Sequence, residues 1–300
     1  MSTARADRGA APSAAPDDAF EARRKKALAM GGPEKLARRK AAGVLNVRER
    51  VDLLVDAGTF IESGLFGTSA TRAEDRDKSA ADGKVAGFGK IDGRECAVVA
   101  NDFTVMGASS SATNGRKIGH MKRVACSRGL PMVFLGESSG ARMPDHMGAR
   151  GMGSLLGNDP TQYMRMRETP WVSATLGFSY GSSSWYSVLS DFNVVRKGAV
   201  LAVSSAQLAS LAIKEKVDPE EMGGWKLHAE VTGFADVVAE TDAEAIAAIK
   251  TFLSYMPAHN REQPPERAVP PDSGQAMPGI AKLLPQKRTQ VYDVRNIIRA

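Results

Sequence analysis

Residues 136–142 (GESSGAR) have the side chains and backbone best suited to chemistry. They directly follow the apolar run at 131–135, which predicts a buried strand. A strand that ends in small residues leaves backbone N–H groups available to a ligand. Such a turn can present a serine nucleophile, or it can bind an oxyanion with its backbone alone. The two alternatives imply different enzymes.

A second small-residue segment, residues 177–184 (GFSYGSSS), has a similar setting. It follows a strand predicted at 172–176 and leads into a helix predicted at 185–189. The start of a helix presents unpaired N–H groups and a dipole that favours negative charge. The two segments could each give one N–H to a single oxygen, and each donor would contribute on the order of 10²–10³ in rate. The simpler alternative is two tight turns without a ligand.

Residues 136–140 also match G-x-S-x-G, the nucleophile turn of α/β hydrolases. Ser138 would then attack the substrate, and Asp191 with either His228 or His259 would complete the triad in the usual chain order. The pattern is short, so chance matches are common. The sequence has no HGG-type oxyanion segment upstream, and nothing in it brings Asp191 near either histidine.

Helices and strands alternate along the chain, which predicts an α/β domain. Asn46 and Glu49 are spaced as a capping box, and Thr241 with Glu244 opens a later helix in the same way. Asp92-Gly93 predicts a hairpin turn. The predicted helices span 33–43, 46–58, 112–126 and a segment from 241, and the strand signals lie at 84–91, 96–102, 131–135, 172–177 and 194–203.

Composition and charge narrow the classes of protein. The chain has 300 residues, is 43% hydrophobic and 25% charged, and lacks an apolar run long enough for a membrane helix or a signal peptide. Its two cysteines form neither a CxxC pair nor a zinc pattern, so we expect a cytoplasmic protein without a metal.

The formal net charge of +6 lies within the first 50 residues. This basic segment is either a solvated surface or a docking site for an anionic ligand. It contains few aromatic residues and no nucleic-acid-binding motif, so nucleic acid is a disfavoured partner.

Several segments, in order and spacing, resemble one family. The chain is similar to the carboxyltransferase β-subunits of biotin-dependent acyl-CoA carboxylases, of the propionyl-CoA and methylcrotonoyl-CoA type. The resemblance covers roughly residues 30–260 and is specific as a set, although no single segment is. The segments that carry it are 31–35 (GGPEK), 45–60 (LNVRERVDLLVDAGTF), 83–87 (GKVAG), 101–109 (NDFTVMGAS), both small-residue segments, 189–192 (LSDF), 218–228 (DPEEMGGWKLH) and 233–235 (GFA).

The resemblance implies a crotonase-like α/β fold, with two such domains in a typical subunit. We expect a disordered basic tail at 1–25, one crotonase-like domain at 26–262, and a linker with the start of an absent second domain at 263–300. An acyl-CoA would bind the first domain, and its thioester oxygen would become an enolate held by backbone N–H groups. Carboxybiotin on a partner chain would deliver the carboxyl group, and biotin itself would take the proton. Partners would be a biotin carboxylase and carrier subunit and a chain with the second domain, in a homo- or hetero-oligomer.

The resemblance assigns the site residue by residue. The catalytic N–H groups would belong to Gly140, Ala141, Gly181 and Ser182. Acyl-CoA would be bound by Ser139, Arg142, Tyr180, Ser183, Arg24, Lys35 and Arg39. For Arg142 a structural bond to a neighbouring carboxylate is the favoured alternative.

The sequence departs from the family pattern at both small-residue segments. The family reads D-S-G-G-A-R at the first, where this chain has Glu137 for the acid and Ser139 for the first glycine. At the second segment a glycine is also replaced, by Ser182, and Tyr180 adds bulk before it. A Gly→Ser change keeps the N–H, but it does not suit a backbone that needs positive φ. These changes imply an altered substrate, or a non-catalytic assembly subunit of the same family as the alternative function.

Overall fold

The computed structural model describes residues 18–147, 168–271 and 273–300. Its contacts divide the chain into two units, Met1–Pro264 and Pro265–Ala300. The second unit has two short helices, η4 (Ile280–Leu283) and α13 (Arg295–Ile298), and its described residues are almost all exposed. No helix among the described residues is long and apolar enough to cross a membrane.

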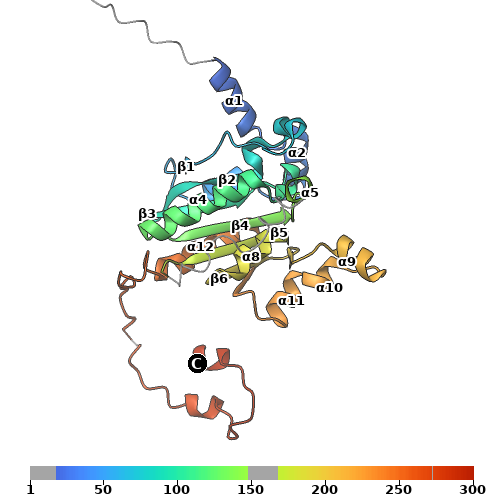
Figure 1. Ribbon diagram of the computed structural model, residues 1–300. Coiled ribbons are helices and arrows are strands. Elements are labelled where there is room, and N and C mark those ends of the chain that lie inside the picture. Colours follow the sequence, from blue (N-terminus) through green and yellow to red (C-terminus); the bar gives the residue numbers. More distant parts are fainter. Residues whose placement is uncertain (1–17, 148–167, 272) are drawn as a thin grey trace, which may run out of the picture. The chain divides into compact units, whose positions relative to one another are not determined.

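A single mixed sheet forms the centre of the first unit (Figure 1). Its strand order is β1-β2-β3-β4-β5-β6-β8, and β7 pairs with the far end of β5. The β2–β3 hairpin turns at Asp92-Gly93 as predicted, and from β3 onward every pairing is parallel. The strands are β1 (Ile61–Glu62), β2 (Lys84–Ile91), β3 (Arg94–Asn101), β4 (Met132–Ser139), β5 (Trp171–Tyr180), β6 (Phe192–Arg196), β7 (Val200–Ala202) and β8 (Val237–Ala239).

Helix boundaries follow the capping signals of the sequence. Asn46 forms the predicted capping box with Glu49, Thr241 accepts the Glu244 N–H, and Gly129 closes a helix at φ 70°. The α-helices are α1 (Asp18–Leu28), α2 (Pro33–Ala41), α3 (Val47–Leu54), α4 (Ala112–Arg128), α5 (Met143–His146), α8 (Ser182–Val188), α9 (Ala206–Ile213), α10 (Pro219–Gly223), α11 (Trp225–Glu230) and α12 (Asp242–Tyr255), and the 3₁₀ helices are η1 (Ala73–Lys78), η2 (Ala80–Gly83) and η3 (Met106–Ala108).

Two apolar clusters bury the two faces of the sheet. Successive residues of β3 and β4 alternate between the clusters, as the period of a strand requires. One cluster joins the sheet to α3 and α12, and the other joins it to α4, with Trp171 and Phe134 ring to ring at 5.6 Å. The layered α/β arrangement predicted from the sequence is therefore confirmed.

Several predicted boundaries were wrong. The helix from Asn46 ends at Leu54 rather than at Gly58. Residues 18–25, placed in the disordered tail, form most of α1, and only residues 1–17 of that tail lie outside the described residues. Both small-residue segments begin as strand, because β4 runs to Ser139 and β5 runs to Tyr180. The turns are therefore shorter than the sequence indicated, and each centres on one glycine.

Candidate functional site

The turns after β4 and β5 lie against each other. Their strands are paired up to their last residues, with Ser139 opposite Tyr180. A Cβ placed on Gly181 would lie 3.3 Å from the Gly140 Cα and 3.8 Å from the Ala141 nitrogen. The structure therefore brings together the four residues whose N–H groups the sequence assigned to an oxyanion.

Hydrogen bonds separate these four amides into two kinds. The Gly140 N–H donates to Ser138 Oγ at 3.1 Å, and the Gly181 N–H donates to the Val203 carbonyl at 3.2 Å. Within the part of the chain that the structure describes, no protein atom accepts from the N–H of Ala141 or of Ser182. Ala141 and Ser182 are thus the two donors that a ligand oxygen could use, whereas Gly140 and Gly181 shape the turns.

The two retained glycines occupy the positions that need glycine. Gly140 has φ 99° and Gly181 has φ 63°, both in the region that residues with a Cβ rarely adopt. Ser139 is a strand residue and Ser182 is the first residue of α8, and neither has positive φ. The two Gly→Ser departures therefore fall where the backbone tolerates a side chain, which removes the strongest objection to an active site.

The predicted substrate contacts around the turns differ in exposure. Ser139 is exposed, and its Oγ lies 2.6 Å from where a Cβ on Gly107 would be. Tyr180 is buried and stacks on Phe178, with ring centroids 5.9 Å apart. Ser183 is also buried; its hydroxyl accepts from Asn101 Nδ2 at 3.2 Å and from Ser179 at 2.8 Å.

Ser110 also lies at the two turns, although nothing in the sequence pointed to it. Its hydroxyl bonds that of Ser182, and its backbone forms a parallel bridge with Ala141. One residue therefore contacts both turns. It lies just after the family-like segment 101–109, but no spacing rule pointed to it.

The serine hydrolase alternative finds no support in the geometry. Ser138 is fully buried, and its hydroxyl donates to the Ala108 carbonyl at 3.1 Å. His228 Nε2 bonds the Leu201 carbonyl, and His259 pairs with Glu262. Ser138 is thus a structural link inside the first turn.

Glu137 anchors the first turn through a buried network of charges. It accepts two hydrogen bonds of 2.9 Å from Arg39 and one of 2.6 Å from Arg50. Burial acts to raise the pKa of Glu137, but the two guanidinium groups outweigh it and hold that pKa below its ordinary value. Asp242 extends the network by accepting from Arg50 and from Arg196. The network joins β4 to α2, α3, α12 and β6.

Two arginines predicted to bind substrate have partners inside the protein. Arg39 forms a bidentate pair with Glu137, and Arg142, which is 4% exposed, pairs with Asp82 at 2.6 Å. The structural role favoured for Arg142 therefore agrees with its surroundings, and Arg39 has the same kind of role. Lys35 donates to the Thr104 carbonyl at 2.9 Å. Arg24 is exposed, 3.7 Å from Glu21.

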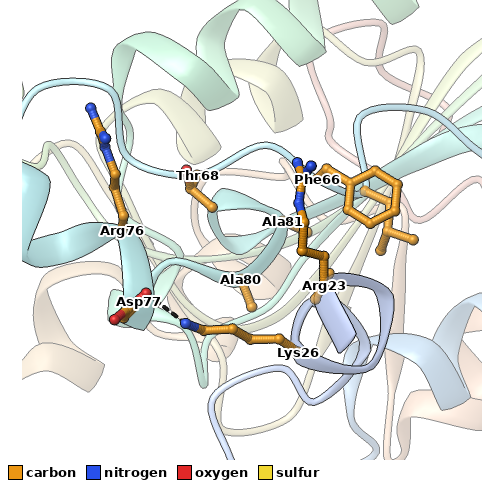
Figure 2. A pocket seen from close by; sticks show the side chains of 10 residues that line it. Arg23, Lys26, Phe66, Thr68, Arg76, Asp77, Ala80 and Ala81 are labelled. Carbon is orange, nitrogen blue, oxygen red and sulfur yellow. Dashed lines mark hydrogen bonds and ion pairs between the residues drawn. The ribbon is translucent and has the colours of Figure 1, made fainter. Parts of the chain in front are cut away.

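A basic pocket lies between α1 and the segment that leads into β2 (Figure 2). Its volume is about 240 Å³. Arg23 lies over the Phe66 ring at 5.3 Å, and Lys26 bonds Asp77 at 2.5 Å. The pocket is lined by Arg23, Lys26, Ala27, Leu65, Phe66, Thr68, Arg76, Asp77, Ala80 and Ala81.

The basic pocket is linked to the paired turns through one ion pair. Ala81 lines the pocket, and the next residue, Asp82, binds Arg142, which directly follows Ala141. The sequence indicated the cations on α1, but it gave no signal for Arg76 or Phe66.

Lys84, which is buried, and Lys117, which is half-buried, lie next to the site, and we expect both to make stability depend on pH. Burial is the main cause that lowers the pKa of Lys84 to about 7 and that of Lys117 to about 8. In the unfolded chain a lysine titrates near ~10.4, so between pH 7 and pH 9 the unfolded state binds more protons. Burying a charged lysine destabilises the folded state. This cost is fully present below the pKa of the lysine in the folded state, and it decreases as the pH rises above that pKa. We expect the free energy of unfolding to increase by up to about 1.4 kcal/mol per pH unit for each lysine.

Urea denaturation at pH 7, 8 and 9 measures this slope, and a Lys117→Met variant should flatten it. A free energy of unfolding that is constant or falls over the range would contradict the expectation. The range stops at pH 9 because burial raises the pKa of Cys96 to about 12, and a raised thiol pKa opposes the trend above that pH.

Solved structures share the fold of this chain. The chain is similar to a structure of transcarboxylase 12S, titled as a hexamer assembly with methylmalonyl-coenzyme A bound, with a TM-score of 0.81 and 28% identity over 94% of this chain and 55% of that chain. It is also similar to the β subunit of geranyl-CoA carboxylase from P. aeruginosa, with a TM-score of 0.66 and 27% identity over 93% of this chain and 51% of that chain. The predicted crotonase-like fold is confirmed.

The amino-acid sequence places the chain within one family of this fold. A family profile described as the carboxyl transferase domain matches residues 38–300. The propionyl-CoA carboxylase beta chain of Roseobacter denitrificans is 32% identical over 285 residues, which cover 93% of this chain and 55% of that protein. The protein belongs to the carboxyl transferase domain family, and it spans about half the length of the curated relatives it matches.

Proposed function

We propose that this chain binds an acyl-CoA and takes part in the transfer of a carboxyl group to the α-carbon of its acyl group. The observation that supports this most directly is the pair of N–H groups of Ala141 and Ser182, which have no acceptor among the described residues and lie on two turns in contact. Donors fixed where negative charge develops stabilise an oxyanion without the cost of reorganisation. Family membership and the CoA substrates named for the similar proteins point to a thioester as the source of that oxyanion.

In the proposed reaction the C–N bond of carboxybiotin, the second substrate that a partner chain delivers, breaks and releases CO₂. The biotin nitrogen freed by this cleavage takes the α-proton of the acyl-CoA, and the thioester oxygen becomes an enolate oxygen. The Ala141 and Ser182 N–H groups donate to that oxygen. The enolate carbon then attacks the carbon of CO₂, which forms the new C–C bond. No side-chain base is needed, which agrees with the absence of a His/Asp dyad among the described residues around the turns.

The basic pocket offers a place for the phosphates of CoA. Arg23 and Arg76 carry guanidinium groups suited to phosphate, and the Phe66 ring offers a flat apolar surface. Lys26 adds a further positive charge, although it is shared with Asp77. In this proposal the acyl-CoA lies with its nucleotide end at α1 and its thioester at the two turns.

Exposed apolar side chains on and around α9 support a partner chain. Val203, Leu208, Leu211 and Ile213 are each more than half exposed, and Val188 on α8 is 58% exposed. Large apolar side chains that are left exposed to this extent are typical of protein interfaces when they form a patch. We infer that a chain with the other carboxyl transferase domain, or a second copy of this one, covers it, and that a biotin carrier works with the assembly. A cytoplasmic location remains a prediction from the two free cysteines.

Calorimetric titration with propionyl-CoA tests the binding part of this proposal. We expect binding, and a double charge reversal, Arg23→Glu with Lys26→Glu, should weaken it at least about tenfold, because two favourable contacts to phosphate become repulsive. Arg24→Glu is the matched control, since Arg24 lies on the same helix but does not line the pocket. It should change the affinity by less than about twofold.

Failure to bind propionyl-CoA or any longer acyl-CoA would contradict the proposal. Equal weakening by the Arg24 variant would place the phosphates elsewhere on α1. Binding without carboxyl transfer, after a biotin carrier and the other domain are added, would instead favour the alternative of a non-catalytic assembly subunit.

A further inference from the structure

Two short turns with a left-handed backbone lie next to the end of β4, just before the Gly140–Ala141 turn. They touch each other, since a Cβ on Gly83 would lie 3.0 Å from the Val105 oxygen and 3.3 Å from the Ala108 Cα. The left-handed conformation is disfavoured for residues with a Cβ, and it persists only where the surroundings hold it. The residues are Ala81, Asp82 and Gly83 (φ 47°, 50° and 71°) and Met106, Gly107 and Ala108 (φ 49°, 60° and 48°).

Lys84, which is buried, and Lys117, which is half-buried, bond the carbonyl groups of these left-handed turns. Lys84 is 2% exposed and its Nζ donates to the Ala108 oxygen at 2.7 Å. Lys117 Nζ donates to the Ala81 oxygen at 2.9 Å and to the Lys84 oxygen. Among the described residues no carboxylate lies within ion-pairing distance of Lys84 Nζ. Burial of an amine without a carboxylate partner is costly, so these contacts call for a role beyond packing.

A chain of hydrogen bonds connects Lys84 to the turn after β4, which contains Gly140 and Ala141. The Ala108 oxygen that accepts from Lys84 also accepts from Ser138 Oγ at 3.1 Å. Ser138 Oγ in turn accepts the Gly140 N–H at 3.1 Å. We propose that Lys84 is a positioning residue for carboxyl transfer, which holds the Ala141 N–H in place through Ala108, Ser138 and Gly140. The inference rests on the proposed function only in taking Ala141 as an oxyanion donor.

The charges around Lys84 make this connection sensitive to pH. Asp82 and Asp102 face Lys84 and favour its charged form, whereas Arg142 and Lys117 disfavour it. Burial is the largest effect and lowers the pKa to about 7, so the amine changes charge near neutral pH. A charged donor makes a stronger hydrogen bond than a neutral one. The turn should therefore be held more tightly below pH 7 than above it.

Amide hydrogen exchange in protein labelled with ¹⁵N-glycine and ¹⁵N-alanine tests the proposal without any substrate. In Lys84→Met the Gly140 amide should exchange at least about tenfold faster, the change expected from loss of one hydrogen bond. The midpoint of global unfolding should stay the same or rise, because a costly buried amine is removed. The control is Lys122→Met on α4, where the buried Nζ lies 4.5 Å from the Tyr186 ring centroid. It should leave Gly140 exchange within about twofold of wild type.

Two further readouts separate positioning from a merely structural role. The Gly140 amide shift of the wild type should titrate with a midpoint near 7, and the titration should vanish in Lys84→Met. Ser138→Ala breaks the middle link, so combining it with Lys84→Met should add little. Unchanged Gly140 exchange in Lys84→Met, or a titration that persists there, would overturn the proposal. These outcomes do not depend on whether the protein binds acyl-CoA.

Discussion

Glu137→Gln should lower the free energy of unfolding by about 3–5 kcal/mol. Glu137 neutralises two buried guanidinium groups at once, since Arg39 and Arg50 both bond its carboxylate. The amide removes the negative charge but leaves the arginines buried, and the uncompensated positive charge is the source of the cost. Urea denaturation at pH 7 measures the change.

Glu34→Gln is the matched control for this loss. Glu34 also pairs with an arginine, Arg38 at 2.7 Å, but the two side chains are 85% and 74% exposed. Exposed pairs contribute little, so this variant should change the free energy of unfolding by less than about 1 kcal/mol. A Glu137→Gln variant as stable as Glu34→Gln would show that the buried network does not hold β4 in place.

Gly181→Ala should lower the rate of carboxyl transfer at least ~100-fold, measured with a biotin carrier and the other domain present. The new methyl group would lie 3.3 Å from the Gly140 Cα, between the two turns, at a φ of 63° that alanine resists. Separation of the turns would move the Ala141 and Ser182 N–H groups away from the enolate oxygen. The dissociation constant for propionyl-CoA should change by only about twofold, because the interaction matters most in the transition state.

Gly198→Ala separates this effect from backbone strain. Gly198 also has positive φ, 79°, but a Cβ there would meet no atom within 4 Å. It should lose about 1 kcal/mol of stability and keep its activity within about twofold. Equal loss of activity in both variants would mean that the contact between the turns is not what matters.

The sequence could predict the helices and strands that position this site. The capping pairs at Asn46 and Thr241, the hairpin at Asp92-Gly93 and the closing Gly129 are local signals, and each holds in the structure. The contact of the two small-residue segments could also be anticipated, because parallel strands end at the same edge of a sheet.

Other features depend on contacts between distant residues, which a local pattern does not reveal. The resemblance assigned Arg39 and Arg142 to acyl-CoA, with a structural bond favoured for Arg142, but the sequence could not name their carboxylate partners, which lie 98 and 60 residues away. Which amides of the turns have acceptors was equally hidden, since the Gly181 N–H bonds Val203 on another segment. Ser139 and Ser182 looked unsuited to their positions only because their φ angles were unknown.

A structure of the protein with a bound, unreactive acyl-CoA analogue would show whether the two turns hold the thioester. We expect the thioester oxygen within about 2.7–3.1 Å of both the Ala141 and the Ser182 nitrogen. We also expect the CoA phosphates beside Arg23 and Arg76 in the basic pocket. A thioester oxygen that contacts neither amide, or an acyl-CoA bound away from the two turns, would contradict the proposed function.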